Sequence, residues 1–326
     1  MFKNKKVLAG LLILIFILII ILGLFYFYSQ GKKTELKQMI FIGIDGMQVS
    51  NYNNLLQQEK LPNFKKIITD NGENNEAIIT GHTSPETAPG NAELLTGLGS
   101  TITGISDNKC GDIIPRGLTI FERLSGFDSK INLGSIYGKE TCYIPLSILS
   151  NAKSVISWWQ DKKTYPQNDY VNNKCTNSND VILKSLEFIK KYRNQSFYLY
   201  IYLGGPDCAG HTFGVPSTLY DESLINVDSG LGYLLDYINS VNLKPQIIIS
   251  GDHGWNVESK NHNIENADTM KVVLITNNHN LIDKDISPKN KKQCDIAPTI
   301  LNYFGMNSGQ YSDITQFGCE SLILNK

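Results

Sequence analysis

This sequence has almost no excess of charge of one sign. Its 30 Lys and Arg residues are balanced by 31 Asp and Glu residues, which leaves a formal net charge of −1. Without a surplus of positive charge, no nucleic-acid-binding surface is evident. Internal repeats are also absent, and the only low-complexity stretch is an apolar run near the N-terminus. These absences exclude a repeat array and predict one folded body beyond the apolar run.

The apolar run covers residues 7–28, VLAGLLILIFILIIILGLFYFY, and contains no charge. It is long enough for a membrane-spanning helix, which needs about 20 apolar residues. Lys3, Lys5 and Lys6 precede it, so residues 1–6 are expected to stay in the cytoplasm and the body to face outward. A cleaved signal peptide is the alternative, but its apolar region would span about 7–15 residues. The sequence favours an uncleaved, single-pass signal anchor held in the lipid bilayer.

A polar stalk is expected at 29–38, followed by the body at 39–326. All six cysteines lie after the apolar run, at Cys110, Cys142, Cys175, Cys208, Cys294 and Cys319. An even number permits up to three disulfides, in fifteen pairings, and fits an oxidising compartment. A set of small buried thiols is the alternative.

The body shows the alternation of strands and helices that is typical of an α/β fold. Apolar runs suited to strands buried on both faces lie at 39–44, 197–203, 247–250 and 272–275. Helical patterns lie between them, at 61–68, 180–192 and 222–241. We expect a mainly parallel central sheet flanked by helices. Residues 151–178, rich in Lys, Asn and Asp, are expected to form a surface excursion that could act as a cap.

Acidic and imidazole side chains follow three of these strands directly. The first strand leads into Asp45, the second into a glycine-rich segment with Asp207 and His211, and the third into Asp252 and His253. Sheets of this kind bind ligands at the carboxyl ends of their strands. We therefore expect these side chains to meet in one site.

Histidine is scarce, with five in the chain. One more, His262, follows the third strand end, whereas His82 and His279 have no such setting and are expected to be surface or structural residues. A mixed set of imidazole nitrogens and carboxylate oxygens suits zinc, and also manganese or iron. The sequence therefore predicts a metal site.

A segment rich in hydroxyl side chains and glycine, 83–108, opens into the apolar stretch AELL. A hydroxyl at the start of that helix would lie near its partial positive charge and free N–H groups, where phosphate binds well. An ordinary helix cap is the alternative. The pattern does not choose between Thr83, Ser84 and Thr87.

Together these residues resemble the alkaline phosphatase superfamily, and within it the type I phosphodiesterase/nucleotide pyrophosphatase proteins. The resemblance covers nearly all of residues 39–306. It rests on six motifs in the family's order and spacing: IGIDGM (42–47), TAPGNAELLTG (87–97), TGISDN (103–108), PDCAGHTFG (206–214), SGDHG (250–254) and DIAPTILNYFG (295–305). The resemblance implies an alkaline phosphatase-like fold and hydrolysis of a small phosphoester substrate.

The resemblance also implies two divalent metal ions, with zinc expected. One ion would be held by Asp45, Thr87, Asp252 and His253, and the other by Asp207, His211 and His262. Thr87 would be the nucleophile and form a phosphoryl-threonine, and Asn108 would donate to a phosphate oxygen. His262 is preferred to His279 because its segment leads into the next strand, as the family's last ligand does.

The same segments indicate the substrate class. Sulfatases need Cys or Ser in a C/S-x-P-x-R pattern, whereas this chain has Thr87 and no arginine up to Asn91. Phosphoglycerate mutases use serine and are cytosolic, which does not fit either. Lys139 matches the lysine that clamps phosphate in threonine-dependent alkaline phosphatases, but Thr141 replaces their arginine. A solvated surface lysine is the alternative. Phosphomonoester and phosphodiester or pyrophosphate substrates both stay open.

Two other classes of protein are alternatives to a hydrolase. A membrane-bound phosphotransferase would move a head group onto a lipid or glycan acceptor through the same phosphoryl-threonine. A catalytically inactive binding module would usually have lost several ligands, whereas all seven ligand positions here hold competent residue types.

Overall fold

The computed structural model describes residues 14–21, 36–69, 76–81, 84–109, 111–139, 155–159, 175–278 and 291–323. They belong to two units, Met1–Leu36 and Lys37–Lys326. In the first unit, residues 14–21 form a helix with exposed apolar side chains, and the rest of the predicted anchor at 7–28 lies outside the described residues. Within the described ranges, no helix combines the length and apolarity needed to cross a membrane. The anchor stays a prediction.

The second unit contains a seven-stranded sheet in the order β2-β7-β6-β1-β5-β3-β4. The strands are β1 (Gln38–Ile44), β2 (Glu76–Thr80), β3 (Asn132–Tyr137), β4 (Val155–Trp159), β5 (Phe197–Leu203), β6 (Gln246–Gly251) and β7 (Lys271–Thr276). Strands β6, β1, β5, β3 and β4 are parallel, β7 pairs antiparallel with β6, and β2 pairs antiparallel with β7 at the edge of the sheet. The predicted α/β fold with a mainly parallel sheet is confirmed.

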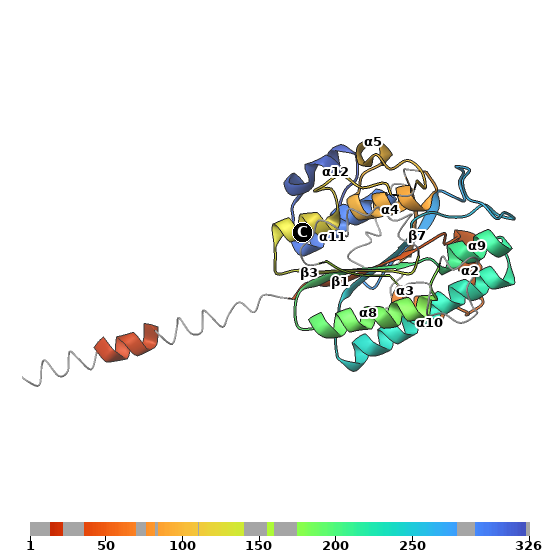
Figure 1. Ribbon diagram of the computed structural model, residues 1–326. Coiled ribbons are helices and arrows are strands. Elements are labelled where there is room, and N and C mark those ends of the chain that lie inside the picture. Colours follow the sequence, from red (N-terminus) through yellow and green to blue (C-terminus); the bar gives the residue numbers. More distant parts are fainter. Residues whose placement is uncertain are drawn as a thin grey trace, which may run out of the picture. The chain divides into compact units, whose positions relative to one another are not determined.

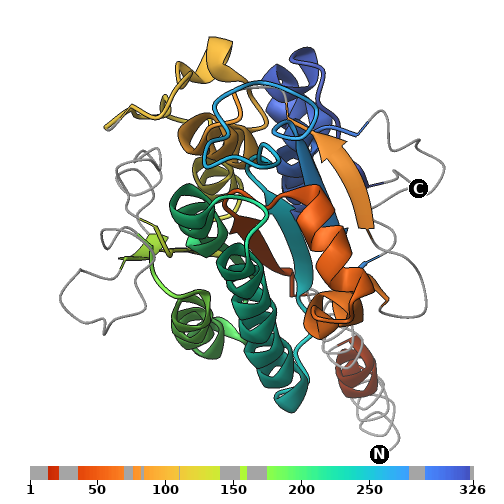
Figure 2. The same cartoon turned by 90° about the vertical axis from the view of Figure 1, so that its right-hand side faces the viewer.

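Helices cover both faces of the sheet (Figure 1). One face packs against α2 (Val49–Gln57), α3 (Pro62–Ile68), α8 (Ser178–Tyr192), α9 (Gly205–Phe213) and α10 (Thr218–Ser240). The other packs against α4 (Thr87–Thr96), α6 (Ile120–Phe127), α11 (Ile296–Phe304) and α12 (Ser312–Gln316), with the short α5 (Ser100–Thr103) nearby. The longest helix, α10, packs along α8 (Figure 2). The three predicted helices correspond to α3, α8 and α10.

Strand β1 shows why helices must cover both faces of the sheet. Its side chains alternate between the two cores, with Met39 and Phe41 on one face and Ile40, Ile42 and Ile44 on the other. All of them are fully buried. A strand with apolar residues on both faces is stable only when both are covered, which explains the uninterrupted apolar run.

One segment differs from its prediction. Residues 151–178 were expected to be a surface excursion, but they contain β4, which pairs in parallel with β3. Its sequence, VISWW, is rich in β-branched and aromatic residues, the composition that favours strands. The strand was not predicted because the residues around it are mostly polar. Residues 151–154 and 160–174 lie outside the described part of the chain.

Four cysteines form two disulfides, Cys175–Cys208 and Cys294–Cys319, so the alternative of buried thiols is wrong for these residues. The other two predicted partners, Cys110 and Cys142, lie outside the described residues. The first disulfide ties the segment before α8 to helix α9, which carries Asp207 and His211.

Candidate metal centre

The three strand-end carboxylates meet because their strands are neighbours. Asp45 follows β1, Asp252 follows β6, and Asp207 lies in the first turn of α9, directly after β5. In the sheet the order is β6, β1, β5, all parallel, so their carboxyl ends form one edge. The three side chains are at most 2% exposed. Three buried carboxylates at one edge of a sheet need cations beside them, because burying a negative charge without a partner is costly.

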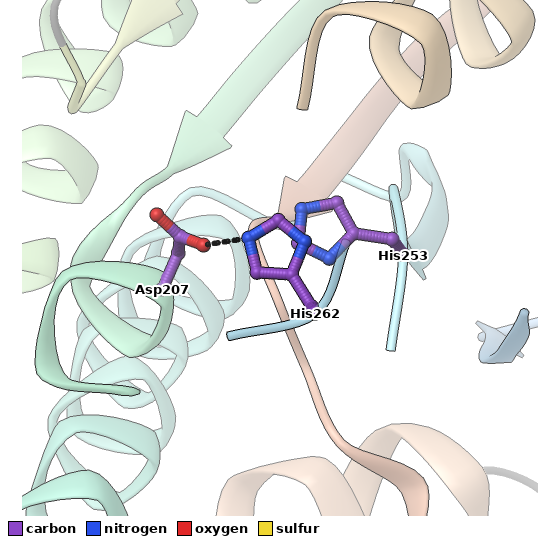
Figure 3. A group of neighbouring side chains, drawn as sticks. All are labelled: Asp207, His253 and His262. Carbon is purple, nitrogen blue, oxygen red and sulfur yellow. Dashed lines mark ion pairs between the residues drawn. The ribbon is translucent and has the colours of Figure 1, made fainter. Parts of the chain in front are cut away.

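Helix α9 and the segment between β6 and β7 bring the imidazoles to the same place. Asp207 and His211 lie four residues apart on α9, so they share one face, with His211 Nε2 3.5 Å from Asp207 Oδ1. His262 Nε2 lies 3.3 Å from the same carboxylate oxygen (Figure 3). The ring of His262 stacks on that of His253, with centroids 4.0 Å apart. Its Nδ1 lies 2.6 Å from the carbonyl oxygen of Pro85, just before α4.

The ligand atoms form two overlapping groups of three, each with all atoms within 4.8 Å of one another. One group is Asp45, Asp252 and His253, and the other is Asp207, His253 and His262. Asp45 Oδ1, Asp207 Oδ1 and His253 Nε2 are buried and make no hydrogen bond to any described residue. Buried polar atoms nearly always have partners, so these atoms and this donor set fit divalent metal ions.

Lys139 lies in the middle of this site. Its Nζ is 2.6 Å from Asp45 Oδ2, 2.6 Å from Asp207 Oδ2 and 3.1 Å from Thr87 Oγ1. The residue follows β3 and is only 6% exposed, so the alternative of a solvated surface lysine is wrong. Its ammonium group therefore contacts one carboxylate from each ligand group.

The charges in the site displace several pKa values. Burial alone would lower the pKa of Lys139, but Asp207 and Asp45 outweigh it and hold this pKa above its usual value. Burial alone would raise the pKa of Asp207, but Lys139 and His262 hold it well below its usual range. Burial and the neighbouring Asp45 raise the pKa of Asp252 to about 7. Such a cluster of displaced pKa values is characteristic of functional sites.

The two stacked histidines differ in their protonation. Burial would lower the pKa of His253, but Asp252 and Asp45 raise it to about 9. Burial and the adjacent His253 lower the pKa of His262. At neutral pH the metal-free site therefore holds a protonated imidazole beside a neutral one, and a metal ion must displace the proton of His253.

Thr87 is the first residue of α4, and its hydroxyl faces Lys139. Asn108 is held beside it: its Oδ1 accepts from the N–H of Ala88 at 2.8 Å, and its own N–H donates to Glu86 Oε2 at 2.8 Å. Because the amide oxygen of Asn108 is occupied, its NH₂ group is left to donate to a ligand. Glu86 was not predicted as a site residue, since nothing in its local sequence marks it.

The structure thus brings six of the seven predicted ligands together with Lys139 in a buried site. The seventh ligand, His211, lies at the rim of this site, where its side chain is 40% exposed. Thr87 belongs to neither ligand group, and its hydroxyl contacts the site at the ammonium group of Lys139. Thr83, His82 and His279 lie outside the described residues.

These pKa shifts predict that the metal-free protein loses stability as the pH rises. The folded state raises the pKa of His253 from 6.5 to about 9, so its stabilising effect is complete below pH 6.5 and lost as the pH passes about 9. The pKa of Asp252 rises from 3.8 to about 7, so its effect is lost as the pH passes about 7. Calorimetry with chelator should show Tm falling between about pH 6 and 9. With zinc, the stabilisation should instead grow with pH, because the ligands bind deprotonated. A metal-free Tm that rises over this range would contradict these assignments.

The mainly parallel α/β fold thus carries a buried acid–imidazole site whose donor atoms fit divalent metal ions. The family model "Type I phosphodiesterase / nucleotide pyrophosphatase" matches residues 133–295, half of the chain, and the chain belongs to that family. The resemblance noted in the sequence is therefore confirmed. The described part of the chain also contains a candidate metal site.

Known proteins that are similar to the chain agree at the level of fold. It is 26% identical over 141 residues to a 2,3-bisphosphoglycerate-independent phosphoglycerate mutase of Metamycoplasma hominis, an alignment that covers 43% of this chain and 26% of the mutase. The chain thus spans about a quarter of that relative.

Among solved structures, a Bacteroides thetaiotaomicron protein from a locus for glycosaminoglycan metabolism matches with a TM-score of 0.60 and 13% identity, over 88% of this chain and 76% of that one. A 2-O GAG sulfatase matches with a TM-score of 0.60 and 14% identity, over 84% and 71%. Murine ectonucleotide pyrophosphatase/phosphodiesterase 5 matches with a TM-score of 0.48 and 18% identity, over 67% and 57%. At these identities the first two matches show the fold alone.

Proposed function

We propose that the chain hydrolyses phosphate diesters or pyrophosphates with Thr87 as the nucleophile. The observation that carries this proposal is the position of the Thr87 hydroxyl, 3.1 Å from an ammonium group that contacts Asp45 and Asp207 at once. The hydroxyl also lies at the N-terminus of α4, where the positive end of the helix dipole favours a bound phosphate. A nucleophile beside an ammonium group that contacts both ligand groups suits in-line attack on a phosphorus atom held there.

The ligands predicted from the family would hold two divalent ions, expected to be zinc, in two sets: Asp45, Thr87, Asp252 and His253, and Asp207, His211 and His262. Bound there, such ions lower the pKa of a hydroxyl and neutralise charge on phosphate and leaving group. Thr87 Oγ forms a bond to phosphorus while the ester bond to the leaving oxygen breaks. The phosphoryl group on Thr87 keeps its second substituent; water then breaks the bond between phosphorus and Thr87 Oγ, which releases the product and restores the threonine hydroxyl. The NH₂ group of Asn108 donates to a non-bridging oxygen during both steps.

The preference for a diester rests on the charge that faces the phosphate. Near neutral pH a phosphomonoester carries about two negative charges, whereas a diester carries one. Lys139 supplies one cationic group, and Thr141, which lies outside the described residues, stands where the family's monoesterases place an arginine. One cationic side chain, Lys139, favours the singly charged phosphate of a diester, in agreement with the phosphodiesterase family model.

A substrate panel tests this function. The full chain in detergent is assayed with zinc on bis-p-nitrophenyl phosphate, p-nitrophenyl phosphate and a nucleotide pyrophosphate, with chelator-treated protein as the control. We expect kcat/KM to be highest on the diester or pyrophosphate and lost with chelator. Faster hydrolysis of the monoester would contradict the substrate class. Zinc binding without hydrolysis of any substrate would instead favour the phosphotransferase alternative.

The same proposal places the catalytic unit outside the cytoplasm, attached through residues 7–28. Two observations support it: the uncharged apolar run, and the two disulfides, which are typical of oxidising compartments. Expressed in cells, the full chain should stay with the membrane pellet after carbonate washing, and protease added to intact cells should digest its body. Recovery in the wash would contradict the anchor.

A further inference from the structure

The carboxylate of Asp252 is fixed by four hydrogen-bond donors. Its Oδ1 accepts from the backbone N–H groups of Gly46 at 3.1 Å and His253 at 2.9 Å. Its Oδ2 accepts from the hydroxyl of Tyr202 at 2.7 Å and from Asn91 Nδ2 at 3.3 Å. Both of these side chains are completely buried. The orientation of this predicted metal ligand is therefore set by the protein itself.

Asn91 is in turn oriented by another tyrosine. The hydroxyl of Tyr200 donates to Asn91 Oδ1 at 2.7 Å, so the amide nitrogen must point the other way. That nitrogen also donates to the carbonyl oxygen of Thr87 at 2.9 Å. Asn91 thus joins the first turn of the helix that carries the nucleophile to the carboxylate of Asp252.

Strand β1 lies between the tyrosines on β5 and Asp252 at the end of β6, and it leaves room for their rings at Gly43. Gly43 pairs with Tyr202 across the sheet. A Cβ atom at this position would lie 2.5 Å from the hydroxyl oxygen of Tyr200 and 2.9 Å from a ring carbon of Tyr202. The absence of a side chain at Gly43 therefore lets both rings cross β1 and reach the site.

We infer that Tyr202, together with Asn91 held by Tyr200, positions Asp252 for its metal ion. These are positioning residues, since they contact the ligand and neither the substrate nor the ion. The inference rests on the proposed function, because it assigns Asp252 as a ligand. Removing such an outer partner of a metal ligand typically costs about 10- to 100-fold in metal affinity or activity.

The chain offers a matched control for this inference. Tyr198 lies on the same strand and in the same core as Tyr200 and Tyr202, and it is equally buried. Its hydroxyl has no hydrogen-bond partner among the described residues. Tyr198→Phe and Tyr202→Phe therefore remove the same atom from the same environment, and only the second removes a contact to Asp252.

The experiment measures zinc affinity by competition with a chelating dye, together with kcat, KM and the Tm of the metal-free protein. For Tyr202→Phe we expect zinc affinity about 10- to 100-fold weaker than in Tyr198→Phe, with KM almost unchanged and kcat recovered at excess zinc. Gly43→Ala should show the same loss of zinc affinity, because its methyl group displaces both rings. Equal zinc affinity in the two phenylalanine variants would overturn the inference.

The outcomes also separate this inference from the proposed function. A wild-type protein that hydrolyses diesters with zinc, with Tyr202→Phe indistinguishable from Tyr198→Phe, would overturn the positioning network alone. A wild-type protein that binds zinc and loses affinity in Tyr202→Phe, yet hydrolyses no phosphoester, would support the network and overturn the proposed function.

Discussion

Thr87→Ala should lower kcat on a phosphodiester by about 10⁴-fold or more, the loss expected when a nucleophile is removed. The hydroxyl lost is the one that contacts the ammonium group of Lys139. The change removes few atoms from a helix whose remaining side chains are buried, so the fold should persist. The measurement is steady-state hydrolysis of bis-p-nitrophenyl phosphate, with metal content determined in parallel.

Thr87→Ser serves as the matched control because it keeps the hydroxyl at the same helix position. We expect it to retain much of the activity that the alanine variant loses, while both variants keep their metal content. Substantial turnover by Thr87→Ala would remove Thr87 from the reaction. Loss of metal from Thr87→Ala alone would instead make the residue chiefly a ligand.

Lys139→Met should destabilise the metal-free protein and increase the stabilisation gained from zinc. The lysine neutralises Asp45 and Asp207, which are both buried. Removing one partner from a buried ion pair typically costs about 3–5 kcal/mol, because a charge is left uncompensated. Divalent ions at the same carboxylates would supply that compensation, so the Tm gain on zinc addition should exceed that of wild type. Activity should fall as well, since the ammonium group lies beside the nucleophile.

The control for this prediction is Lys65→Met, which removes an exposed lysine paired with Glu59 at 3.3 Å. Exposed ion pairs contribute about 0–1 kcal/mol, so neither its Tm nor its response to zinc should change measurably. Calorimetry of both variants with and without zinc gives the comparison. An equal zinc response in Lys139→Met and wild type would show that the lysine and the metal ions do not share the carboxylates.

The sequence predicted which acidic side chains lie close together, because these residues follow strand ends. The apolar runs marked β1, β5 and β6, and the acids after them converge because parallel neighbours place their carboxyl ends on one edge. The apolar run at 272–275 predicted a strand but not the direction in which that strand runs, so the antiparallel pairing of β7 with β6 was not predicted. The direction of a strand depends on its connection to the previous one, which apolar composition does not encode.

The contacts that orient the ligands were missed for a different reason. In FYLYIYL the tyrosines alternate on one face, and the pattern indicates only a buried strand. Their hydroxyl partners, Asn91 and Asp252, are 109 and 50 residues away in the chain. Lys139 posed the same difficulty, since its partners lie 94 and 68 residues away. Such long-range polar contacts follow from the tertiary packing and not from local sequence.

The similarity to a sulfatase structure illustrates the limit of fold as a guide to function. That similarity, at 14% identity, concerns the arrangement of sheet and helices. In this chain α4 begins with Thr87 and the segment up to Asn91 holds no arginine, so it lacks the C/S-x-P-x-R pattern expected of sulfatases. Function has to be argued from such residues.

The central claim, that Thr87 forms the covalent intermediate, is tested most directly by trapping that intermediate. The zinc-loaded protein is mixed with bis-p-nitrophenyl phosphate, quenched in acid within the first turnovers and digested for peptide mass spectrometry. We expect a p-nitrophenylphosphoryl adduct on the peptide that contains Thr87, located at that residue by fragmentation and absent from Thr87→Ala. An adduct on another residue such as Ser84, or one that persists in Thr87→Ala, would contradict it.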